Sequence, residues 1–81
     1  MMEDLILGVS ASELFKSIIQ KNPLMDGRKL GDILTYEYPN VSPAASISIR
    51  RWLNKEGGYE CDDEDISALI LFYLKDAGYV D

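Results

Sequence analysis

The residues best suited to chemistry gather in one short stretch of the C-terminal third. Cys61 is the only cysteine of the chain, and acidic residues surround it. These acids are Glu60, Asp62, Asp63, Glu64 and Asp65. A thiol at the start of a helix could act as a nucleophile, because the helix dipole lowers the thiol pKa. Clustered carboxylates could instead coordinate calcium or magnesium through their oxygens.

Neither chemistry has its full set of groups. The chain contains no histidine, the commonest general base and metal ligand. The acids around Cys61 disfavour a thiolate, and their spacing lacks the alternating D-x-D-x-D-G order of a calcium loop. Helix capping explains most of these acids without a metal, because acids stabilise the first turn of a helix. We therefore predict no catalytic residue, no metal site, no cofactor and no small-molecule substrate.

The second group of candidate residues is basic and lies in the middle of the chain. Between residues 27 and 55, five basic and two acidic residues give a balance of +3. From residue 56 onward, eight acids and one lysine give −7, within a total of −6. The sequence thus predicts a local basic patch on an acidic protein. The acidic C-terminal third is suited to steering a basic partner.

Four helices must position these residues, because the hydrophobic spacing and the capping residues predict helices at 11–21, 26–38, 43–56 and 63–77. Ser10 and Glu13 suggest a capping box. Ser42 and Pro43 suggest the start of the third helix, and Gly57-Gly58 its end. Gly31 inside the second helix predicts a close helix contact, since glycine there costs about 1 kcal/mol. We expect one all-α domain over residues 1–81, a small four-helix orthogonal bundle.

Such a short chain has a thin core, since a domain of this size buries only roughly 60–65% of its unfolded surface. The single cysteine predicts a reducing compartment. The first residues carry acids, where a secretory signal would carry lysine or arginine, and their apolar run is short. We therefore expect a cytoplasmic protein without a membrane partner.

The third helix has two faces. Its buried stripe is predicted to contain Ala45, Ile49, Trp52 and Leu53. The opposite face holds Ser46, Ile47, Arg50, Arg51 and Asn54. Together with its neighbour, this helix gives the segment 28–53, "RKLGDILTYEYPNVSPAASISIRRWL", which resembles helix-turn-helix domains. The shared features are the L-G-D-I-L first helix, the V-S-P entry and the Arg-Arg-Trp-Leu end of the second helix.

That resemblance implies a nucleic-acid binder with a helix-turn-helix-like unit at 28–53. Ser46, Ile47, Arg50 and Arg51 would then face a DNA groove, while Arg28, Lys29 and Lys55 would contact phosphates. The alternative is an ordinary helical hairpin, whose arginines keep the outer face in water.

The fourth helix is apolar almost all round. Leu71 and Phe72 lie off its predicted core face, so they are candidates for contact with another molecule. Our leading hypothesis is therefore a small acidic, non-enzymatic regulator or adaptor. It would act by protein–protein contact with a partner or with a second copy of itself. The alternative is a helix-turn-helix transcriptional regulator that uses the basic face of residues 43–55.

Overall fold

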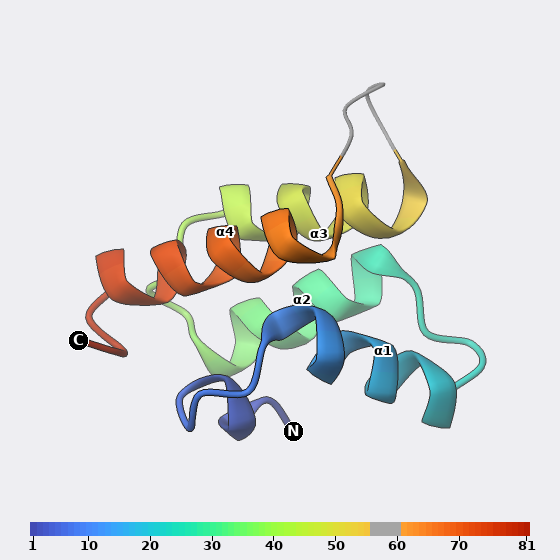
Figure 1. Ribbon diagram of the computed structural model, residues 1–81, viewed down its shortest axis with the longest axis horizontal. Helices are drawn as coiled ribbons and strands as arrows, with labels where there is room; N and C mark the ends of the chain where they lie inside the picture. The colour runs from blue at the N-terminus through green and yellow to red at the C-terminus, as the bar shows by residue number, and fades with distance from the viewer. Residues whose placement is uncertain (56–60) are drawn as a thin grey trace.

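Four α-helices and one short 3-10 helix form the chain in a computed structural model, which describes residues 1–55 and 61–81 (Figure 1). The elements are η1 (Glu3–Leu5), α1 (Ala11–Lys21), α2 (Gly27–Glu37), α3 (Ala44–Asn54) and α4 (Asp63–Asp76). No strand is present in these ranges, which confirms the predicted all-α class. Figure 1 shows α2, α3 and α4 running in alternate directions, and the orthogonal packing that we predicted is not confirmed. The helix-turn-helix unit stays a prediction.

The helix starts use the predicted side chains, with small differences. Ser10 Oγ accepts a hydrogen bond from the Glu13 N–H at 3.4 Å, but the reciprocal half of that capping box is not formed. Asp62 and Asp65 form a complete capping box at the start of α4. Such caps satisfy backbone donors that have no partner inside the helix.

The third helix is shorter than we predicted. It begins at Ala44, and its N-cap is Pro43, which has no side-chain cap bond, rather than the predicted Ser42. Ser42 Oγ still accepts a hydrogen bond from the Ala44 N–H at 3.2 Å. It ends at Asn54, because Lys55 takes the left-handed conformation (φ 56°) that stops a helix. The predicted terminator Gly57-Gly58 and the predicted end at residue 56 lie outside the described residues.

Helices α2 and α3 pack against each other most closely. A Cβ atom added at Gly31 would lie 2.9 Å from both Cβ and Oγ of Ser46. At Gly27, the added atom would lie 3.2 Å from the backbone of Arg50. The predicted reason for Gly31 is therefore correct: its missing side chain lets α3 approach.

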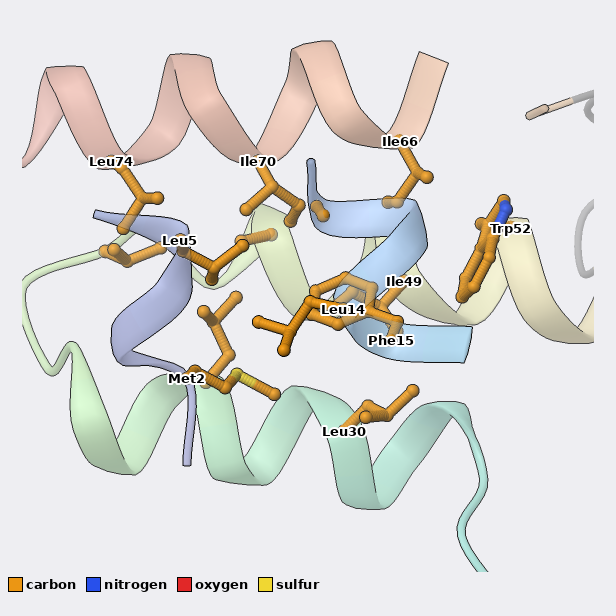
Figure 2. Packing of buried hydrophobic residues seen from close by; sticks show 14 of the residues in the cluster. Met2, Leu5, Leu14, Phe15, Leu30, Ile49, Trp52, Ile66, Ile70 and Leu74 are labelled. Atoms are coloured by element: carbon orange, nitrogen blue, oxygen red, sulfur yellow. The ribbon is translucent and has the colours of Figure 1, made fainter. Parts of the chain in front are cut away.

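The core lies between this α2–α3 pair and the helices α1 and α4 (Figure 2). From α4, Ile66, Ile70 and Leu74 point into it. The rings of Phe15 and Trp52 meet at 5.9 Å between centroids. The sequence predicted the apolar stripes that supply these residues.

The segment before α1 also belongs to the core, which the sequence did not predict. Met2 is fully buried and Leu5 nearly so, and in Figure 2 Leu5 lies below α4 while Met2 lies beside α2. Tyr38 Oη donates to the Met2 carbonyl at 2.8 Å, and the Met2 N–H donates to Glu37 Oε1 at 2.8 Å. These bonds fix η1 against the end of α2.

The α2–α3 contact yields a stability prediction. Gly31→Ala should lower the free energy of unfolding by up to about 2 kcal/mol. Overpacking costs about 1–3 kcal/mol, and the higher helix propensity of alanine offsets about 1 kcal/mol of that cost. Urea denaturation measures this change.

A Ser46→Gly background provides the control, since it removes the Cβ and Oγ atoms that the alanine meets. In that background Gly31→Ala should cost less, as a double-mutant cycle would show. A stabilising Gly31→Ala in the wild-type background, or an equal change in both backgrounds, would contradict the close contact.

Candidate protein-binding surface

The predicted outer face of α3 is divided by the fold. Ser46 is half-buried against α2, where its Oγ donates to the Gly31 carbonyl and lies 3.2 Å from Thr35 Oγ1. Arg50 is half-buried too, with its Cα and Cγ against Gly27. The prediction that Ser46 and Arg50 face away from the bundle was wrong. Helix α2 covers these two polar residues as well as the apolar stripe of α3, and the apolar spacing alone does not indicate this.

The other predicted basic-face residues are at the surface. Ile47 is 40% exposed, and Arg51 and Asn54 are exposed on the same side of α3. Arg28, Lys29 and Lys55 are also exposed, and Lys29 Nζ donates to the Leu24 carbonyl at 2.9 Å. The outward face of α3 is thus narrower than predicted, and it combines one large apolar residue with one arginine.

Most acids of the C-terminal stretch have structural partners. Asp62 and Asp65 cap α4. Asp63 accepts hydrogen bonds from Lys16 Nζ and from Trp52 Nε1, the latter at 3.0 Å. The Lys16 bond, and after it the Trp52 bond, lower the pKa of Asp63 below its ordinary value. Glu64 makes no such contact among the described residues, and the predicted candidate Glu60 lies outside them.

Cys61 is a poor nucleophile in this setting. Its side chain is buried, and burial raises the thiol pKa, with Asp65 and Asp62 adding to the effect. Cys61 instead belongs to the hydrophobic core, as a small packing residue before α4. Within the described ranges, no group of three or more histidine, cysteine, aspartate or glutamate side chains could hold a metal ion.

The outward face of α4 carries the exposed large apolar residues of this helix. Phe72 is 60% exposed and Leu71 is 45% exposed, and the small Ala68 between the same turns is exposed as well. The Phe72 ring packs edge-on against Tyr73 at 5.4 Å between centroids, which leaves its outer side in water. The structure therefore brings the two predicted apolar contact residues together at one face.

A groove runs along each side of this face, and Ala68 borders both. The first groove, of about 300 Å³, lies between α4 and the segment before α1, and Gly8, Val9 and Leu71 line it. The second, of about 550 Å³, lies between α4 and α3, and Arg51, Asp65 and Phe72 are among its lining residues. The α4 face, defined as Ala68, Leu71 and Phe72, is thus a ridge between two shallow grooves.

The first groove was not visible in the sequence. Gly8 and Val9 reach it because η1 folds back onto the core through Met2 and Leu5. In the sequence, the burial of this segment is indicated only by the apolar residues Met2 and Leu5, and two residues are too few to define a helical repeat.

Comparisons with protein families, with curated proteins and with solved structures find no match for this chain. None of the described helices is long and apolar enough to cross a membrane.

The contacts of Asp63 predict a pH-dependent contribution to stability. Since its folded-state pKa is lowered, the contribution is complete above the unfolded-state pKa, about 4. It is lost as the pH falls through the folded-state value. Asp63→Asn should therefore lower the urea midpoint at pH 7, and the gap to wild type should narrow below about pH 4.

Glu13→Gln is the matched control, because it removes a first-turn acid of α1 whose carboxylate makes no contact among the described residues. Its midpoint should stay close to wild type at pH 7. A gap for Asp63→Asn that does not change with pH would contradict the role of the Lys16 contact.

Proposed function

We propose that this protein is a non-enzymatic binding protein that acts through protein–protein contact, with the α4 face as its contact surface. The observation that carries the proposal is the exposure of Leu71 and Phe72 on adjacent positions of a helix whose other side forms the core. Exposed apolar patches mark interaction sites, and phenylalanine is among the residues enriched in protein interfaces.

The charges around the α4 face support the same function. Asp65 and Arg51 line the groove beside Phe72, so a charged border lies next to an apolar centre. This is the usual organisation of an interface, with an apolar middle and a polar rim. The surrounding acids would orient the partner rather than supply most of the affinity.

Nucleic-acid binding has less support from the same geometry. A recognition helix needs several side chains free to reach base edges. On α3, Ser46 bonds to α2, and both the Arg50 stem and the Asn54 amide lie beside Gly27. Ile47 and Arg51 are the exposed residues of the predicted face that remain away from α2. We therefore propose a protein partner as the primary function and duplex binding as the rival.

The primary proposal predicts that Leu71→Ser combined with Phe72→Ser abolishes association while the fold remains. Sedimentation of the purified chain measures self-association. Affinity capture followed by crosslinking measures binding to another protein. Both side chains are outside the core, so circular dichroism should be unchanged.

Leu24→Ser combined with Tyr36→Ser is the matched control. These residues are 83% and 87% exposed but are not among those lining either groove. The control should associate as wild type does. A wild-type chain that neither self-associates nor retains a partner would sink the proposal, and so would equal losses in both double variants.

The rival is tested with Arg51→Glu combined with Lys55→Glu, two exposed basic positions of the third helix and its cap. We expect wild type and variant alike to show no salt-sensitive binding to a duplex DNA pool at about 50 mM salt. Even non-specific phosphate contacts would register under those conditions. Wild-type binding that the variant loses would favour the nucleic-acid function instead.

A further inference from the structure

The outward side of α4 carries a repeat that extends beyond the α4 face. Glu64, Ala68, Leu71 and Lys75 follow one another at intervals of four, three and four residues, and all four are exposed. Side chains at this spacing form one ridge along a helix. Two such helices can pack together along that ridge, as in a coiled coil.

The ridge is self-complementary when a second copy is laid against it in the opposite direction. The pairs Glu64–Lys75 and Ala68–Leu71 share the same midpoint, between Leu69 and Ile70. A two-fold axis at that midpoint would place each Glu64 opposite Lys75 of the second copy. It would also place each Leu71 opposite the small Ala68 of that copy.

The opposite orientation has no such complementarity. A parallel pair in register would place Glu64 against Glu64 and Lys75 against Lys75 of the second copy, and like charges at close range are unfavourable. Leu71 would also meet Leu71, while the space beside Ala68 would stay empty. Charge and size therefore favour the same antiparallel arrangement.

The two charged residues are available for this contact. Three acids of the first turn of α4 and its cap already have partners, as Asp62 and Asp65 form the capping box and Asp63 bonds to Lys16. Among the residues that the structure describes, neither Glu64 nor Lys75 forms an ion pair within the chain.

We propose that the partner of the α4 face is a second copy of this chain, held by antiparallel pairing of the two α4 helices about an axis between Leu69 and Ile70. This inference rests on the proposed function and gives it a definite partner. Phe72, beside the ridge, covers Ala68 of the second copy from the flank of the second groove. The apolar residues supply most of the affinity, and the Glu64–Lys75 pairs set the direction.

The pairing predicts a charge-swap experiment on the full chain, read by sedimentation velocity from about 10 µM to 1 mM. Glu64→Lys and Lys75→Glu should each raise the dimer dissociation constant by about tenfold, because two pairs are lost and two repulsions are gained. Mixing the two single variants should restore association, since each introduced charge then meets its opposite. The double variant should associate as wild type does.

Net charge alone cannot produce that result. Glu64→Lys reduces the net charge from −6 to −4, which lowers the general repulsion between copies, yet the proposal expects weaker association. Asp32→Lys and Lys21→Glu make the same charge changes at exposed positions away from α4 and should leave the dissociation constant unchanged.

The outcomes separate the two proposals. A wild-type chain that stays monomeric at about 1 mM, or single variants that fail to recover on mixing, would overturn the antiparallel pairing. If that monomer still binds another protein and loses it in the Leu71→Ser and Phe72→Ser variant, the proposed function stands. A monomer with no partner of either kind would overturn both.

Discussion

The close approach of α2 and α3 at Gly31 decides how the rest of the chain is arranged. With Ser46 held against Gly31, the rotation of α3 about its own axis is fixed. Ile49 and Trp52 then turn into the core, while Ile47 and Arg51 turn outward. A larger residue at position 31 would push the helices apart, and the interior packs too densely to absorb such a shift without cost. The contact therefore sets both the core and the part of α3 left for binding.

Trp52 connects this α2–α3 pair to the remaining helices. Its ring contacts Phe15 of α1, and its Nε1 donates to Asp63 at the start of α4. The same carboxylate accepts from Lys16 of α1, so one acid joins three helices at one end of the bundle. At the other end, Leu5 lies below Leu74, and Met2 fills the space beside α2. With its inner side occupied at both ends, α4 presents the opposite side to solvent.

The sequence was sufficient to predict the four helices, because caps and apolar spacing are local signals. It was also sufficient to place Leu71 and Phe72 off the core, since a helix has only one inward side.

The sequence was not sufficient to predict that Ser46 and Arg50 pack against α2. Polar residues can pack against a neighbouring helix through their stems, and Gly27 and Gly31 made that possible on the partner helix. Nor could it place Met2, whose burial depends on long-range bonds to Glu37 and Tyr38. The failures at Ser46, Arg50 and Met2 are thus tertiary, because they concern contacts between elements that are far apart in the sequence.

The acidic residues around Cys61 have separate structural roles, which the composition of the stretch does not show. As sequence, it suggested a metal site, a reactive thiol or one acidic surface. In the structure, Asp62 and Asp65 satisfy backbone donors, and Asp63 joins α1 to α3. Among the acids of this stretch that the structure describes, Glu64 makes no contact within the chain, and it lies on the ridge that also carries Leu71 and Lys75. A small domain gains much from such a contact, because its own core is thin. Covering Leu71 and Phe72 would bury apolar surface that an 81-residue chain cannot cover by itself. The requirement for stability and the proposed binding function therefore favour the same face of α4.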